Sequence, residues 1–411
     1  MPRNDHFRAG RGPLENNPNL ELQRSHVSGA LPFLNPTVAR YRPAKAKTET
    51  EKETQPDHQR PTKIEHVWRS RDNRKGRHVL RVDYDHPQTK NTPPLTSTYK
   101  AVTNSILRMA TYCPYWDVSY LVATIFTIGS VIWIINAFFV WLPLQDPRSE
   151  FAGEELQGGG ITAFIGATVF EIGSVLLLLE AVNANQSGCF GWALETELKG
   201  GEVQDPESQV SLTRVDACQH HHANTKNLMG TGKLDHRLSH DIATGYATPL
   251  PEGKSFCWWP SLYDLRTHYM HELGFLASLI QFLAATIFWI AGFTGLPGII
   301  NHMSQGLTDG IYWVPQIVGG VGFVISGLLF TLETQKKWYI PAFNVLGWHI
   351  GVWNFIGGVG FTLCGALGPV SSSSGIDYQA CLATFWGSWA FMIGSTVQWY
   401  ESLQKYPVEK K

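Results

Sequence analysis

The stretch "FMIGSTVQWYE" (residues 391–401) determines how the chain is interpreted, because two other stretches repeat its form. These are "FEIGSVLLLLE" (170–180) and "FVISGLLFTLE" (323–333). Each has an Ile two residues after the Phe, then a Gly/Ser pair, and a Glu ten residues after the Phe. On a helix these positions lie along one stripe. We therefore predict three helices that pack through this stripe, where small residues allow close backbone approach.

Six apolar runs separate this chain from ordinary soluble proteins. Only 16% of its 411 residues are charged, while 44% are hydrophobic. The runs cover 118–142, 160–182, 273–297, 311–332, 346–367 and 380–400, and none contains Lys or Arg. An apolar run of about 20 residues crosses a bilayer as a helix. The sequence predicts an all-α polytopic membrane protein with six transmembrane helices.

The odd-numbered runs also resemble one another. Residues 273–295 align without gaps on 346–368, with six of 23 positions identical. In the first run we place Phe126 on Phe282 and Trp133 on Trp289. The prediction is three parallel copies of one helical hairpin, related by an axis along the membrane normal. Biased membrane composition is the alternative explanation for the similarity.

The remaining segments are polar, and the boundaries follow from the spans. The predicted parts are a cytosolic tail (1–117), hairpin 1 (118–182), a cytosolic His-rich loop (183–272), hairpin 2 (273–333), a linker (334–345), hairpin 3 (346–401) and a short tail (402–411). The long tail and the loop are expected to be largely disordered. Within the tail, alternation predicts a possible β-hairpin at 63–85, and an amphipathic pattern predicts an interfacial helix at 98–113.

The distribution of basic residues predicts the orientation. The loops 143–159, 298–310 and 368–379 contain one basic residue, Arg148. Because Lys and Arg remain on the cytoplasmic side, both termini are expected in the cytosol, in the plasma membrane or an endomembrane. The bilayer is the one partner that the sequence predicts, and the basic tail is a candidate for contact with anionic lipid. No cofactor, nucleic acid or named protein partner is indicated.

The repeated phrase also carries a family resemblance. "FEIGSVLLLLE" and "FMIGSTVQWYE" resemble the F-x-I-G-S signature of the small two-helix YrhK-type membrane domain. The chain as a whole resembles uncharacterised fungal multipass membrane proteins, notably in "NVLGWHIGVWNFIGGVGFTLCGALG" (344–368). The resemblance covers the membrane part and implies a fold and a location, but no activity.

The Glu that ends each phrase has two interpretations. Glu180, Glu333 and Glu401 are all expected at the cytosolic mouth of the bundle. They form either a carboxylate ring that concentrates cations or a set of helix-end anchors. The anchor interpretation is favoured by Lys337 and Lys405, which follow Glu333 and Glu401 in the i,i+4 order.

Glu171 is the strongest candidate for a functional residue. It lies near the middle of the second span, where a carboxylate costs a few kcal/mol. A proton or cation site is one interpretation. The other is a protonated carboxyl bonded to a neighbour such as Asn136 or Gln281. His349 is the other titratable candidate, although an interfacial hydrogen bond suits its position better.

A weak metal motif lies in the His-rich loop. It consists of Cys218, His220, His236 and His240, whose last pair has a zinc-like spacing. Zinc modules normally open with two thiols and this loop offers one, so a polar loop without metal is favoured.

The last two thiols flank the loop 368–379. Cys364 and Cys381 are candidates for a disulfide in an oxidising lumen.

Two functional classes follow from these features. The favoured class is a non-catalytic membrane scaffold or accessory protein, since the spans contain few polar groups. The alternative is a channel or a transporter of a cation, a proton or another small solute, with Glu171 as its functional group. No enzyme motif is present.

Overall fold

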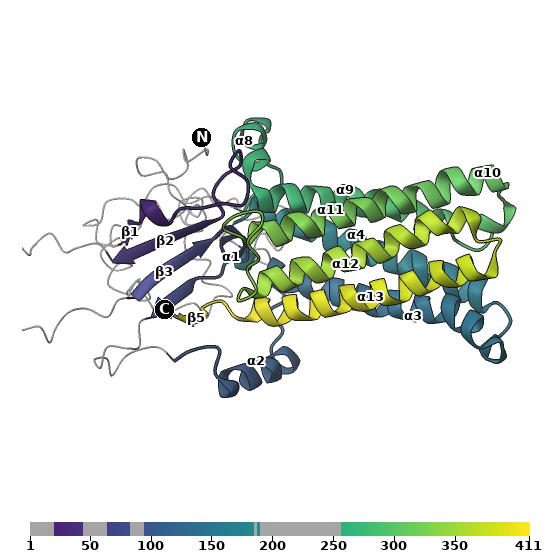
Figure 1. Cartoon of the computed structure of the whole chain (residues 1–411), viewed down its shortest axis with the longest axis horizontal. Coiled ribbons are helices and arrows are strands. Elements are labelled where there is room, and N and C mark those ends of the chain that lie inside the picture. The colour runs from purple at the N-terminus through teal and green to yellow at the C-terminus, as the bar shows by residue number, and fades with distance from the viewer. Residues whose placement is uncertain (1–19, 44–63, 83–93, 185–186, 190–255) are drawn as a thin grey trace, which may run out of the picture.

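Six long helices form the body of the molecule (Figure 1). The computed structural model describes residues 20–43, 64–82, 94–184, 187–189 and 256–411. The long helices are α3 (Val118–Gln145), α4 (Gly160–Val182), α9 (Leu273–Thr294), α11 (Val314–Glu333), α12 (Leu346–Leu367) and α13 (Ser374–Leu403). Each is long and apolar enough to cross a membrane, which confirms the six predicted helical runs.

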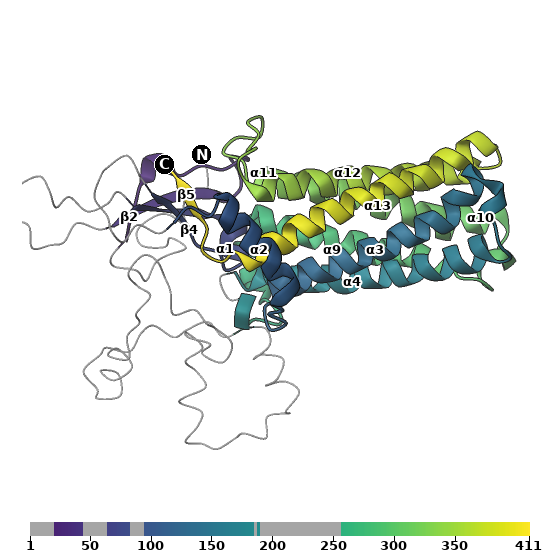
Figure 2. The same ribbon diagram turned by 90° about the horizontal axis from the view of Figure 1, so that it is seen from below.

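The six helices form a closed ring. Each packs against the helices before and after it in the chain, and α13 returns to pack against α3. Figure 2 shows α3, α4 and α13 side by side along the bundle. Sequential packing of this kind suits short connections between antiparallel neighbours.

A five-stranded sheet lies at one end of the bundle, which we call the sheet end (Figure 1). Its strands are β1 (Leu20–Leu22), β2 (Val38–Pro43), β3 (Ile64–Arg69), β4 (Val79–Val82) and β5 (Val408–Lys410), in that spatial order. The first four pair antiparallel, whereas β5 runs parallel to β4. The sheet therefore joins the described N-terminal strands to β5, the last strand.

The prediction of a largely disordered tail is wrong for residues 20–43. Ala39 and Tyr41 of β2 are buried and pack with Trp68 of β3 in a small apolar core. The tail 402–411 is not separate either, because Val408 pairs with Leu80. Strand pairing across more than three hundred residues leaves no local pattern in the sequence.

The segment predicted as a β-hairpin contains β3 and β4, which are antiparallel. They are joined by a one-turn helix, α1 (Ser70–Arg74). Gly76 follows it with a φ of 61°, a left-handed conformation that favours glycine. The predicted interfacial helix corresponds to α2 (Tyr99–Thr111), which leaves Ile106 and Leu107 exposed.

The far end of the bundle, opposite the sheet, is built from short helical turns (Figure 1). These are η4 (Pro147–Ser149), η5 (Glu154–Gly159), η9 (Ile300–His302), α10 (Gln305–Thr308), η10 (Asp309–Trp313) and η11 (Gly368–Val370). Two of them, η5 and η10, are π-helical turns that lead directly into α4 and α11.

Two layers of aromatic rings fill the middle of the bundle. Trp133, Phe288 and Phe361 form a closed triangle, with ring centroids 4.9 to 5.7 Å apart. Below them Phe391 contacts Phe170 and Phe323, the Phe residues of the repeated phrase, at 5.5 and 6.0 Å. Edge-to-face contacts at these distances are favourable.

The first layer corrects the predicted register of the first helix. Trp133 lies in one aromatic layer with Phe288 and Phe361. Trp289 instead stacks on Phe293 and donates to Thr168. A one-residue shift of the register matches Ser119 with Gly274, and each of these contacts a Glu of the repeated phrase. The predicted register aligns Phe126 with Phe282 and Trp133 with Trp289, but the two Trp side chains lie in different surroundings.

Glycine allows close helix packing, as the phrase predicts. A Cβ on Gly327 would lie 2.5 Å from the backbone nitrogen of Phe355, and one on Gly358 would lie 2.7 Å from that of Val324. Both contacts join α11 to α12. Backbone cannot move aside as a flexible side chain can, so these positions accept only glycine.

We expect Gly327→Val to destabilise the bundle by about 1–3 kcal/mol, because overpacking separates α11 from α12. Thermal unfolding of the detergent-solubilised protein measures the loss. Gly306→Ala is the matched control, since no atom lies within 4 Å of a Cβ there. Equal melting temperatures for the two variants would contradict the packing role.

Candidate functional site: a charged junction between sheet and bundle

The three Glu residues that end the repeated phrases meet at the sheet end. Glu180, Glu333 and Glu401 come from α4, α11 and α13, and the exposed fraction of each is 0%. A buried carboxylate needs a cation or several hydrogen bonds to remain charged. All three find their cations in residues 69–77. We call this set of contacts the junction.

Arg74 of α1 joins two of the carboxylates. Its Nη1 donates to Glu180 Oε1 at 2.6 Å, and its Nη2 donates to Glu333 Oε2 at 2.9 Å. Its guanidinium also lies over the Phe330 ring, 5.1 Å from the centroid. Burial opposes the charge of Arg74, but Glu333 and Glu180 outweigh it and raise the pKa of the guanidinium. Arg74 thus links α4 to α11.

Arg71 and Arg77 hold the third carboxylate. Arg71 donates to Glu401 through Nε at 3.2 Å and Nη2 at 2.8 Å, and Arg77 Nη1 donates to it at 2.9 Å. A two-pronged guanidinium contact fixes orientation as well as distance. Asp72 accepts from Arg77 at 2.6 Å, so α1 also compensates its own charges.

Small residues on the odd helices make room for these contacts. A Cβ on Gly274 would meet Glu333, and one on Gly347 would meet Arg71. At the matching position of α3, Ser119 donates to Glu180 at 2.8 Å. The carboxylates and guanidiniums can therefore lie between the helix ends.

Lys75 completes the junction. It has no exposed surface, and its Nζ lies 3.4 Å from Glu180 Oε2. Burial lowers the pKa of Lys75 to about 8, although the nearby Glu180 carboxylate acts in the opposite direction and raises it. The Lys75 carbonyl accepts from Lys405 Nζ at 2.8 Å, which connects α1 to the chain that leads into β5.

A second set of ion pairs ties the junction to the sheet. Arg69 donates to both oxygens of Glu409 in β5, at 2.8 and 3.0 Å, and its Nη1 donates to Asp72 at 3.2 Å. Lys405 also pairs with Asp117, the N-cap residue of α3. Arg69, Arg71, Arg74, Lys75 and Arg77 balance Asp72, Glu180, Glu333, Glu401 and Glu409. The five basic side chains are consequently unavailable to lipid headgroups.

The predicted i,i+4 pairs do not form, and this expectation is corrected. Glu333 binds Arg74 while Lys337 donates to the Tyr339 hydroxyl, and Lys405 turns to Asp117 instead of Glu401. The carboxylates do not form an open ring either, because α1 covers them. The carboxylates pair with buried guanidinium groups and not with exposed lysines, because an ion pair in water adds little to stability.

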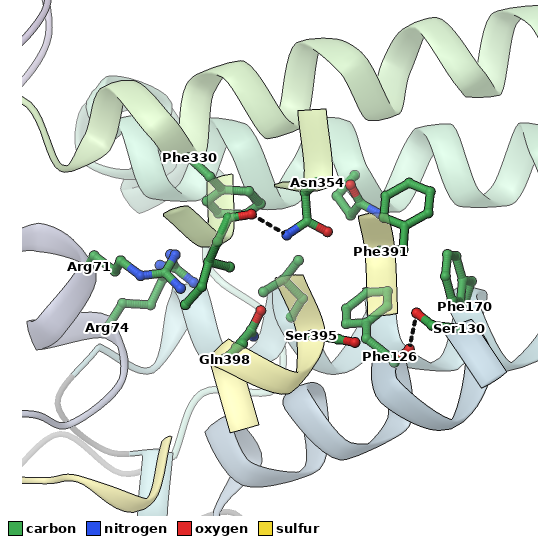
Figure 3. A pocket seen from close by; sticks show the side chains of 13 residues that line it. Arg71, Arg74, Phe126, Ser130, Phe170, Phe330, Asn354, Phe391, Ser395 and Gln398 are labelled. Atoms are coloured by element: carbon green, nitrogen blue, oxygen red, sulfur yellow. Dashed lines mark hydrogen bonds between the residues drawn. The ribbon is translucent and has the colours of Figure 1, made fainter. Parts of the chain in front are cut away.

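A small cavity lies directly beneath the junction (Figure 3). Its volume is about 30 Å³, with Arg71 and Arg74 at one end and Phe170 and Phe391 at the other. This is room for about two water molecules.

Polar side chains from the helices line the same cavity. Asn354 donates to the Ile350 carbonyl at 2.8 Å. Gln281 and Gln398 are more than nine-tenths buried and have no hydrogen bond to any described residue. Polar groups therefore lie on the bundle axis, enclosed between the aromatic layers and the junction.

The residues of the predicted ion site do not come together. Glu171 lines neither cavity and accepts from Thr286 Oγ1 at 2.9 Å. Asn136 donates to the Gly159 carbonyl at 2.6 Å, near the far end, and Gln281 lies in the central cavity. His349 bonds to the Phe343 carbonyl at 2.8 Å. These four residues therefore lie in four separate places and do not form one site.

The predicted disulfide does not form. Cys364 and Cys381 are both free thiols, and Cys364 Sγ accepts from Gln316 Nε2 at 3.1 Å.

The weak metal motif of Cys218, His220, His236 and His240 lies outside the described residues. Within the described ranges no three His, Cys, Asp or Glu side chains are placed to hold a metal ion.

Residues 69–77 are the part of the junction that sequence reasoning missed. The segment reads "RSRDNRKGR" and carries five basic residues in nine. From the sequence alone, these basic residues are expected to contact anionic lipid. Glu180, which has no Lys at i+4, was the available signal that the three carboxylates needed a shared partner elsewhere.

No protein-family model, curated protein or solved structure matches this chain.

We expect Glu401→Gln to destabilise the protein by about 3–5 kcal/mol, because it leaves the buried Arg71 without its carboxylate. Arg71→Gln should cost less, because Arg77 still pairs with Glu401. The double variant should lose less than the sum, with a coupling of about 0.5–3 kcal/mol. Thermal unfolding of all four forms measures this cycle. Arg148→Gln, at an exposed far-end position, should change stability by less than about 0.5 kcal/mol. Strict additivity would contradict the contact.

Proposed function

We propose that this chain is a non-catalytic membrane scaffold that holds a cytosolic sheet in a fixed position on a six-span bundle. The observation that carries the proposal is the junction. Three carboxylates from three helices converge on one segment of the sheet module, and all are fully buried. A tether alone would need one contact, whereas this arrangement fixes both position and rotation.

We propose further that the bundle consists of three copies of one hairpin, inserted in the same direction. Matching positions support this: the Phe, the Gly/Ser pair and the Glu of each phrase are buried alike. They are Phe170, Phe323 and Phe391; Gly173/Ser174, Ser326/Gly327 and Gly394/Ser395; and Glu180, Glu333 and Glu401. The likeness to YrhK-type two-helix domains and to fungal multipass proteins is consistent with such a repeat and adds no activity.

The sheet end is proposed to face the cytosol. The described N-terminal strands and β5 both lie at this end (Figure 1). The far-end loop 143–159 carries four acidic residues and one basic residue, Arg148. The acidic residues are Asp146, Glu150, Glu154 and Glu155. This asymmetry is typical of a non-cytosolic surface. The plasma membrane or an endomembrane is the proposed location.

The alternative of transport through Glu171 has weaker support. Two aromatic layers close the axis of the bundle, and Glu171 lies away from that axis, bonded to Thr286. A scaffold needs no open path, so the closed axis favours the first class.

We expect the sheet to be held rigidly in lipid nanodiscs. Spin labels are attached at Ser25→Cys and Gly306→Cys in a background without native cysteines. Pulsed electron paramagnetic resonance should give a narrow distribution of the distance between the two labels. Glu333→Gln combined with Glu401→Gln should broaden it, because Glu180 is then the one bundle carboxylate of the three that still holds α1. Asp309→Asn at the far end is the control. A broad distribution in the unmodified junction would overturn the scaffold proposal.

We expect the two ends of the bundle to differ in accessibility. In sealed vesicles with the cytosolic face outward, an impermeant maleimide should label Cys113, which is exposed near the sheet end. Gly306→Cys, with all other cysteines replaced, should react only after permeabilisation. The reverse pattern would place the sheet outside the cytosol and contradict the orientation.

A further inference from the structure

A large vestibule opens at the far end of the bundle, on the opposite side of the aromatic layers from the junction. Its volume is about 700 Å³, which is within the range of small-molecule sites. Trp133, Phe288 and Phe361 form part of its lining, and the triangle that they make closes its inner end. The vestibule is therefore a dead-end cavity with an aromatic floor.

The wall of this vestibule is acidic and lacks counter-charges. Glu150, Glu154, Glu155 and Asp377 line it, and none of them forms an ion pair with any residue in the part of the chain that the structure describes. Glu154 is only 5% exposed, and among the described residues its carboxylate accepts one hydrogen bond, from the Phe151 backbone N–H at 3.2 Å. A carboxylate buried to this degree is normally paired.

Two buried amides add acceptor oxygens. The Asn136 amide nitrogen donates to Gly159 and to Thr162, and that of Gln316 donates to Cys364. The oxygen of each amide accepts no hydrogen bond from a described residue, although both side chains are more than nine-tenths buried and line the vestibule. Acceptors without donors suit a ligand that carries N–H groups.

We propose that the vestibule binds a small organic ammonium ion with an apolar body. The carboxylates and amide oxygens accept from the ammonium, and the aromatic floor packs against the apolar part and attracts positive charge. No three His, Cys, Asp or Glu among the described residues are placed for a metal ion, so the geometry favours an organic cation. The proposal does not depend on the scaffold function, which concerns the opposite end.

The test uses 2-phenylethylammonium and its neutral counterpart 2-phenylethanol, with calorimetry on the full chain in maltoside micelles. The ammonium should bind about tenfold more tightly than the alcohol, a difference of about 1.4 kcal/mol. Equal affinities, or no saturable binding of the ammonium at roughly 10 mM, would overturn the proposal.

Variants localise the site. Glu155→Gln with Asp377→Asn should weaken ammonium binding about tenfold and leave alcohol binding unchanged. Asp309→Asn, at a half-buried far-end carboxylate outside the lining, should retain affinity. An equal loss in the Asp309 variant would show that surface charge alone attracts the probe. If the double variant does not fold, the comparison of the ammonium and the alcohol on the unmodified chain still tests the proposal.

The same chemistry has a lipid source, the ethanolamine headgroup. Nanodiscs of phosphatidylethanolamine and of phosphatidylcholine distinguish the two, because the choline headgroup has no N–H donor. Loss of probe binding only in phosphatidylethanolamine identifies a headgroup as occupant. Equal binding in both identifies a soluble amine.

Discussion

Carboxylates buried without exposed surface constrain the rest of this structure. Glu180, Glu333 and Glu401 lie at the ends of three helices, and each would cost several kcal/mol if left without a cation. One short helix, α1, supplies the cations for all three together with the residues that follow it. The position of the sheet is therefore not independent of the bundle, because the bundle cannot bury these groups without it.

The ion pairs of the junction determine how the sheet is placed on the bundle more than they raise the free energy of unfolding. A buried ion pair often contributes no more than a well-packed apolar pair, yet removing one partner is costly. Arg74 reaches α4 and α11, while Arg71 reaches α13. A sheet rotated by one helix position would leave at least one carboxylate without its donor. The junction thus selects one arrangement of sheet and bundle out of several that would bury similar apolar area.

The sequence predicted the bundle well and the sheet poorly, and the reason is physical. Each long helix satisfies its own backbone within about 20 consecutive apolar residues, so composition alone identifies it. The sheet depends on Leu80 pairing with Val408, a contact that no local periodicity records. The repeated phrase that ends in Glu was also recognisable, because all of its residues lie within a short stretch of one helix. Its partners were not, because Arg71 lies 330 residues before Glu401.

The bundle treats the two sides of its aromatic layers differently, and charge explains the difference. At the sheet end every junction carboxylate has a cation from the same chain, so the site is complete and closed. At the far end Glu154 is buried without one in the described part of the chain, and the space beside it remains open. The aromatic rings between the two ends contain few polar atoms and keep the cavities separate. A molecule built in this way is neutralised by its own sheet on one side and is complementary to an external cation on the other.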